Sequence, residues 1–273
     1  MSKEHKDISN LSKEMLKKMF AAGIRFDGRK LDEFRDIEIS YDVSNKAEGS
    51  ARVKLGKTDV IAGIKLEVGE PYADSPDKGN LMVAGELLPI ASPDFESGPL
   101  GFDDIETPRL VDRAIRAADM IDLSKLVITP GEKVWTVIVD VYPLNDDGNL
   151  VDASIIAAVA ALKNSVIPCL DKDGKIDHEK KSKTPLQLKK DATPLLISFS
   201  KLGDKFILDP TREEDQACDM RITWGISKIK EGYRLNACQK RGESPLTAHD
   251  IQIMADVLPK KYEELSKKLK NLV

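Results

Sequence analysis

The sequence holds little of the side-chain chemistry from which metal centres, disulfide frameworks and nucleophilic active sites are built. Its 273 residues include only three histidines and three cysteines. Cys169, Cys218 and Cys238 lie far apart and form no CxxC pair, so neither a disulfide framework nor a zinc ribbon is indicated. The histidines are scattered in polar surroundings and form no metal-binding or catalytic-triad pattern. We therefore expect no metal and no cofactor.

Long apolar runs are also absent. The first residues are polar and lack the apolar core of a signal peptide, and no apolar run reaches the length of a membrane span. Together with the sparse, separated cysteines, this pattern predicts a cytoplasmic protein with no membrane partner. Hydrophobic residues make up 41% of the chain and charged residues 32%, which fits one large or two ordinary globular domains.

Aromatic residues are few, at 5%, and the net charge is −4. An acidic chain does not attract nucleic acid through its overall field, so any such contact must come from a local basic patch. The dispersed aromatic residues form no stacking platform. Contacts with a nucleic acid would therefore be mostly to phosphate, tolerant of sequence and weakened by salt.

One stretch provides such a patch. Residues 106–119, ETPRLVDRAIRAAD, predict a helix with Thr107 as N-cap and Pro108 at the first helical position. Three arginines follow at spacings of four and three, which places them on one helical face: Arg109, Arg113 and Arg116. Four small or apolar residues can pack inward on the other side: Val111, Ala114, Ile115 and Ala118.

Two interpretations of this face stay open from the residues alone. The planar guanidinium group carries several hydrogen-bond donors and stays charged near pH 7, which makes it suitable for binding phosphate. The alternative is a solvated helix face on which Glu106, Asp112 and Asp119 neutralise the arginines.

The remaining segments alternate between strand and helix patterns. A helix over residues 8–22, capped by Ser9 or Ser12, carries an apolar stripe of Leu11, Met15, Leu16, Met19 and Phe20 that must dock on this chain or on a neighbour. Arg25, Arg29 and Arg35 alternate with acidic residues, which indicates local ion pairs. Strand-like runs occupy 37–41, 50–56, 58–71, 80–91 and 133–141, and then 195–203, 205–210, 220–228 and 233–242.

Two further helices are expected. Residues 153–162 are apolar all round and predict a central buried helix, with Asp152 as its N-cap. A long amphipathic helix runs from about Pro245 to Leu272, and Pro259 should kink or split it. The order of sheet, helix and helix occurs twice, which favours an α+β protein of two similar lobes. We expect an N-terminal helical extension (1–23), a first lobe (24–170), a polar linker or surface loop (171–191) and a second lobe (192–273).

Three stretches in the first half together resemble the ribonuclease PH family: RFDGRKLDEFRDI, GSARVKLGKTDVIAGIK and VYPLNDDGNLVDASIIAAVAAL. The second half is similar more loosely, through LDPTREEDQACDMRITWG. The resemblance implies a ribonuclease PH-like fold (of the ribosomal protein S5 domain 2-like kind), with mixed sheets packed against helices and an additional N-terminal helix.

Within that family, the N-terminal helix, ETPRLVDRAIR and DPTREED resemble the non-catalytic ring subunits of the archaeal exosome. This resemblance implies a hexameric ring in which the chain alternates with a catalytic ribonuclease PH-like sister subunit. It further implies RNA-binding cap subunits and a single-stranded RNA substrate, degraded from its 3′ end by phosphorolysis. The chain would bind RNA and help to structure the sister subunit's active site.

The resemblance also bears on single residues. Catalytic relatives carry adjacent arginines just before the helix that corresponds to 107–121, whereas this chain has GPLGFDDIE there, with Asp103, Asp104 and Glu106. The acids Asp209, Asp215 and Asp219 remain, with a short spacing between the last two. The resemblance therefore implies no catalytic residue in this chain. It implies RNA contacts from Arg113 and Arg116, with Arg109 as a further candidate.

Two alternatives stay open. The chain could be a self-sufficient phosphorolytic 3′–5′ exoribonuclease that uses Arg113, Arg116, Asp215 and Asp219. It could instead be an RNA-binding module with no nuclease partner.

Overall fold

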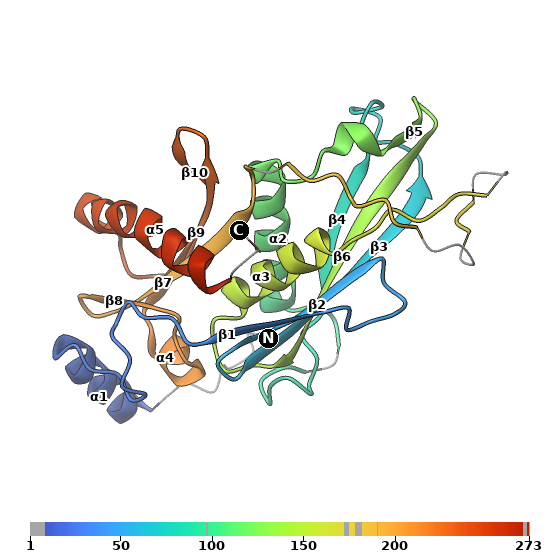
Figure 1. Cartoon of the computed structure of the whole chain (residues 1–273). Coiled ribbons are helices and arrows are strands. Elements are labelled where there is room, and N and C mark those ends of the chain that lie inside the picture. The colour runs from blue at the N-terminus through green and yellow to red at the C-terminus, as the bar shows by residue number, and fades with distance from the viewer. Residues whose placement is uncertain are drawn as a thin grey trace.

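The computed structural model describes residues 9–96, 98–171, 175–177, 182–189, 191–269 and 272. Two β-sheets with helices between and beside them form the described part (Figure 1). The first sheet has the order β1 (Ile37–Tyr41), β2 (Gly49–Leu55), β3 (Thr58–Gly69), β6 (Lys133–Asn145), β4 (Asn80–Gly85), with β5 (Val127–Thr129) also paired to β6. The second has the order β10 (Gly232–Gly242), β9 (Met220–Ile229), β7 (Pro194–Leu202), β8 (Lys205–Leu208).

The first sheet is mixed, because β4 runs parallel to β6 while its other pairs are antiparallel. The second sheet is antiparallel throughout. The predicted α+β class is confirmed, and the strands lie where they are predicted, except that the run predicted over 80–91 ends as a strand at Gly85 and β6 continues to Asn145. The exact domain boundaries stay predictions. Within the described residues, no helix has the length and hydropathy to cross a membrane. Parts of the predicted 171–191 loop, namely residues 172–174, 178–181 and 190, lie outside the described residues.

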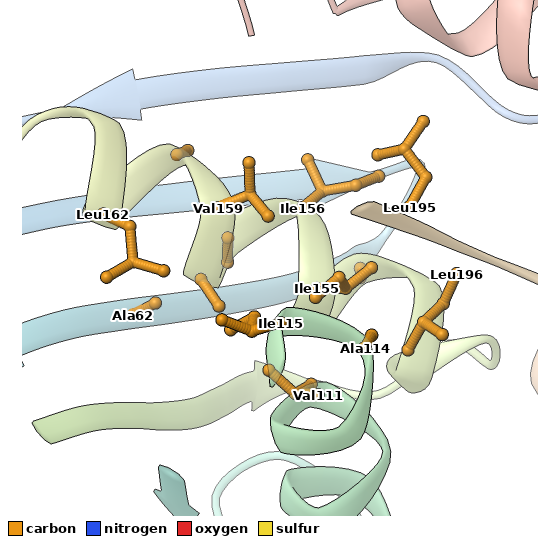
Figure 2. Packing of buried hydrophobic residues seen from close by; sticks show 14 of the residues in the cluster. Ala62, Val111, Ala114, Ile115, Ile155, Ile156, Val159, Leu162, Leu195 and Leu196 are labelled. Carbon is orange, nitrogen blue, oxygen red and sulfur yellow. The ribbon is translucent and has the colours of Figure 1, made fainter. Parts of the chain in front are cut away.

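Helix α3 (Leu150–Lys163) lies between the two sheets and contacts β2 and β3 on one side and β7 on the other. Every residue from Val151 to Leu162 is buried. Five of these twelve residues are alanines, and such small side chains allow the helix to approach both sheets closely. Figure 2 shows Ile155 of α3 packed with Ile115 of α2 (Phe102–Ala118) and with Leu196 of β7. The predicted central helix is confirmed, and the core is continuous across both sheets.

The predicted N-cap role of Asp152 is wrong. Asn149, in the left-handed backbone conformation, precedes the helix, and Asp152 lies in its first turn. The fully buried Asp152 carboxylate accepts hydrogen bonds from the Ser198 backbone N–H (3.1 Å) and from the Ser198 hydroxyl (2.7 Å). Burial raises the pKa of Asp152 to about 7, although the two donors from Ser198 favour its charged form. Asp152 therefore ties α3 to β7 and does not cap the helix.

The start of α2 also differs from the sequence-based expectation. The helix begins at Phe102, so Thr107 and Pro108 lie inside it. Asp103 and Asp104 occupy the first turn, where negative charge is favourable, and Asp104 accepts a hydrogen bond from the Gly101 N–H at 2.7 Å. The acidic segment is therefore the first part of the helix and not a loop before it.

The first and last helices are largely as predicted. Ser9 caps α1 (Asn10–Ala21), whose Leu16 and Phe20 pack against Leu202, Ile207 and Ala217 of the second half of the chain. The rest of the apolar stripe is not covered in the same way, since Leu11 is 82% exposed. Helix α5 (Ala248–Lys268) contacts β7 and β9 and runs unbroken through Pro259, so the predicted split does not occur.

The arginines near the N-terminus make mostly long-range contacts, and only the Arg29–Asp27 pair (2.7 Å) fits the predicted local pairing. Arg25 forms a buried ion pair with Glu214 of α4 (Arg212–Ala217), with 2.9 Å between Nε and Oε1. Arg35 binds the fully buried Asp209 through two nitrogens, at 2.9 and 2.7 Å. Local pairing is wrong for Arg25 and Arg35 because folding places the 209–214 segment beside them.

Asp209 is the centre of this network. Its carboxylate also accepts hydrogen bonds from Arg29 (3.0 Å) and from the side-chain amide of Asn149 (2.9 Å). Its own backbone adopts φ 48°, a conformation that non-glycine residues seldom take. The network joins the N-terminal segment, the turn before α3 and the end of β8.

We expect Glu214→Ala to lower the free energy of unfolding by about 3 kcal/mol, since it leaves the Arg25 guanidinium buried without its carboxylate partner. Glu213→Ala, on the exposed side of the same helix, should change it by less than about 0.5 kcal/mol. Urea denaturation of both variants measures the difference. The double change Arg25→Met with Glu214→Leu should recover much of the loss, because no unpaired charge then remains. Equal midpoints for Glu214→Ala and Glu213→Ala would contradict the proposed importance of the pair.

Candidate functional site

The predicted arginine face lies on the exposed side of α2. The apolar residues on the opposite side of the helix are buried, as predicted: Val111, Ala114, Ile115 and Ala118. The exposed stripe continues towards the helix start through Phe102 and Ile105, which are 64% and 42% exposed. The face is therefore basic from Arg109 to the end of α2 and apolar at its beginning. It can offer guanidinium groups to an anion without unfolding any element.

The three arginines are held to different degrees. Among the described residues, Arg109 makes no hydrogen bond or ion pair. Arg113 donates one hydrogen bond, from Nη1 to Oε1 of Gln239 at 3.0 Å. Arg116 is bound by Asp112, at 2.8 and 2.9 Å, and also donates to the backbone oxygen of Leu81. Arg109 and Arg113 thus keep most of their donors free, while Arg116 shares its charge with a neighbour.

The alternative of a neutralised face applies to Arg116 alone. Of the three acids proposed as partners, only Asp112 pairs with an arginine of this face. Asp119 pairs with Lys189, and Glu106 turns towards the second sheet.

A cavity of about 360 Å³ lies beside the first turns of α2. Its walls come from α2, α4, the start of α3, β9 and β10, and so from both halves of the chain. Its ionisable carboxylates and guanidinium groups are Asp94, Asp103, Glu106, Asp146, Asp215, Asp219, Arg212, Arg221 and Arg241. Six carboxylates therefore share the cavity with three arginines.

Each cavity arginine is already paired with a carboxylate of this chain. Arg221 binds Glu106 at 2.7 Å, and Arg241 binds Glu106 at 3.1 Å and also Asp103. Arg212 binds Asp94. A phosphate ion entering the cavity would have to displace these carboxylates and face an excess of negative charge. The arrangement disfavours phosphate binding within this chain.

Among the described residues, three of the cavity acids form no ion pair with an arginine, and burial affects the pKa of each. Burial raises the pKa of Asp146, and it raises the pKa of Asp215 although Arg221 and Arg241 act in the opposite direction. Burial also acts to raise the pKa of Asp219, but the hydrogen bond from Lys13 and the Gly203 N–H lower it below its usual range. Lys13 lies 2.7 Å from Asp219.

The structure separates the three acids that the sequence placed together. Asp215 and Asp219 line the cavity, whereas Asp209 is buried in the network with Arg35. Within the described residues, no group of three or more histidine, cysteine, aspartate or glutamate side chains could hold a metal ion. Sequence reasoning missed the roles of Arg221 and Arg241. Their partners lie more than 100 positions away, and no local pattern marks such pairs.

The fold and the family model agree. Models of the 3′ exoribonuclease family match residues 33–168 (domain 1) and 192–254 (domain 2). The chain belongs to the 3′ exoribonuclease family, and the resemblance to ribonuclease PH proteins is confirmed.

Several archaeal relatives bear one name. The "Exosome complex component Rrp42" of Methanothermobacter thermautotrophicus is 43% identical over 250 residues, which is 90% of each chain. The protein of that name from Thermoplasma acidophilum is 44% identical over 253 residues, covering 92% of this chain and 93% of the relative.

Two solved structures are similar over nearly the whole chain. One is described as the Archaeoglobus fulgidus exosome with RNA bound to the active site, with a TM-score of 0.87 and 41% identity over 96% of this chain and 98% of the other. The second is an archaeal exosome core, with a TM-score of 0.82 and 38% identity over 95% and 96%.

The paired carboxylates of the cavity generate a prediction. Asp103→Asn combined with Glu106→Gln should free Arg221 and Arg241 and allow inorganic phosphate to bind. Phosphate at ten times its Kd would then stabilise this variant by about 1.4 kcal/mol, which thermal unfolding detects as a rise in Tm. The original chain and the control variant Asp204→Asn with Glu132→Gln, which changes two exposed acids, should show no such rise. An equal rise in Tm with phosphate in the original chain would contradict the conclusion that the cavity carboxylates prevent phosphate binding.

Proposed function

We propose that this chain is a non-catalytic subunit of an exosome that degrades RNA from the 3′ end, and that it binds RNA for a catalytic sister subunit. Phosphorolysis uses phosphate as the attacking group, so the active site must hold an anion beside the anionic RNA backbone. The observation that carries the proposal is the cavity between the two halves of the chain, in which each arginine is neutralised by an internal carboxylate. Such a cavity lacks free cationic donors for phosphate.

The exposed face of α2 supports the RNA-binding part of the proposal. Arg109 and Arg116, the outer members of the row, are seven positions apart, or about 10 Å along the helix axis at 1.5 Å per residue. Such a row can serve neighbouring phosphates of a single strand without reading its bases. The described part of α2 offers guanidinium groups there and no aromatic platform, apart from Phe102 at the opposite end of the stripe.

The names of the similar proteins support an exosome subunit as the partner of this chain. Proteins at 43 and 44% identity are named exosome complex components, and a similar chain belongs to an exosome with RNA bound at its active site. We infer that this chain alternates with a catalytic ribonuclease PH-like sister subunit in a hexameric ring. RNA-binding cap subunits would bind that ring, and single-stranded RNA would reach the sister subunit's active site past the arginine face of α2.

The proposal is tested by comparing the chain alone with the reconstituted complex. With single-stranded RNA and inorganic phosphate, the purified chain should release no nucleoside diphosphate, whereas the mixture with the sister subunit should release it. Trimming by the chain alone that depends on phosphate, and that Asp215→Asn abolishes, would instead support a self-sufficient exoribonuclease. Failure to form a complex with any protein of the same family would favour an RNA-binding module without a nuclease partner.

The arginine face makes a quantitative prediction. In the reconstituted complex, changing Arg109 or Arg113 to Gln should each weaken RNA binding and reduce the slope of log K against log salt by about 0.7, the value for one lost contact to a single-stranded phosphate. Arg116→Gln should have a smaller effect because Asp112 already shares the charge of Arg116. Fluorescence anisotropy at several salt concentrations measures both quantities.

Lys205→Gln is the matched control for this series. Lys205 is an exposed cation on β8, at the edge of the second sheet opposite to β10. Its loss should leave the salt slope unchanged. Identical slopes for the Arg113→Gln complex and the Lys205→Gln complex would refute the RNA-binding role of α2.

A further inference from the structure

Side chains of strand β10 contact α2 at three places along the helix. Near the helix end, Arg234 donates to the backbone oxygen of Ala118 at 3.3 Å. In the middle, Oε1 of Gln239 accepts from Arg113, and near the helix start Arg241 binds Glu106. The edge strand of the second sheet is therefore aligned with the arginine face, although it lies more than 100 residues further along the chain.

The contact with Arg113 fixes the orientation of the Gln239 amide. A guanidinium group has donors only, so the atom that faces it must be the amide oxygen and not the amide nitrogen. The Nε2 group of Gln239 is left with two N–H donors, and these have no hydrogen-bond partner among the described residues. A neutral donor is thus held next to a guanidinium group on the exposed face of α2.

The side chains that hold Arg113 and Arg116 differ in charge. Arg116 is bound by a carboxylate, which neutralises the charge that it holds in place. Arg113 is bound by a neutral amide, which restrains the guanidinium group and leaves its full positive charge available. Restraint before binding lowers the side-chain entropy that is lost when an anion binds.

We propose that Gln239 and Arg113 form one phosphate site, in which Gln239 orients the guanidinium group and adds its own amide donors to the bound oxygen atoms. The inference rests on the proposed RNA-binding role of Arg113 and extends that role to the second sheet. The ligand is a phosphodiester of single-stranded RNA.

The test uses the reconstituted complex with the sister subunit and an oligoadenylate labelled at its 5′ end. Gln239→Met keeps the length of the side chain but removes its acceptor and its donors. Affinity should fall roughly three- to tenfold, the effect of a lost hydrogen bond of about 1 kcal/mol, while the salt slope stays the same because no charge is lost. Gln239→Glu should also reduce the slope by about 0.7, since the new carboxylate neutralises Arg113.

Gln252→Met and Gln252→Glu are matched controls, because Gln252 is exposed on α5 and donates a hydrogen bond to Asp256 of the same helix. Both should leave affinity and slope unchanged, and none of the four variants should shift Tm appreciably. If the Gln239 variants behave like the Gln252 variants while Arg113→Gln weakens binding, the inference is wrong and the proposed function stands. If Arg113→Gln also leaves RNA binding unchanged, the proposed RNA-binding role of α2 is itself wrong.

A double-mutant cycle separates a shared site from a general structural effect. In an Arg113→Gln background, Gln239→Met should cost clearly less affinity than in the original chain, because the two residues act on the same phosphate. Fully additive losses would overturn the proposal.

Discussion

The buried carboxylate of Asp209 is the interaction on which the two halves of the chain depend. It accepts hydrogen bonds from two arginines of the N-terminal segment and from Asn149, which precedes the central helix. A charge withdrawn from water is tolerated only where such partners surround it, so the three segments must assemble together. The adjacent pair of Arg25 with Glu214 extends the same constraint to α4. The cavity wall contributed by α4 is held in place as a consequence.

Helix α2 distributes charge in a way that serves both stability and the proposed function. Acidic residues lie in its first turns and arginines in its later turns, which is the favourable arrangement with respect to the helix dipole. The acidic end turns into the cavity and neutralises arginines from β9 and β10. The basic end faces outward. A single helix therefore neutralises the arginines of the chain's own cavity and presents to the outside the basic face that we propose for RNA binding.

The alanine-rich helix α3 makes this arrangement possible. Its small side chains allow both sheets to pack closely on it, and the second sheet then extends its edge strand along α2. The β10 residues that contact α2 are Arg234, Gln239 and Arg241, and their pairing with β9 places all three on one face of the second sheet. The result places Gln239 beside Arg113 and Arg241 beside Glu106, contacts that depend on the closeness of the two halves.

The sequence alone was sufficient for the α+β class, nearly every strand, the buried central helix and the exposed row of Arg109, Arg113 and Arg116. These features follow from local periodicity, which a short stretch of chain contains in full. The tertiary structure alone decided the start of α2, the role of Asp152, and the partners of Arg25, Arg35, Arg221 and Arg241. An ion pair between distant residues leaves no periodic trace in the sequence. Only the packing of two sheets around α3 determines which charges meet and which remain exposed.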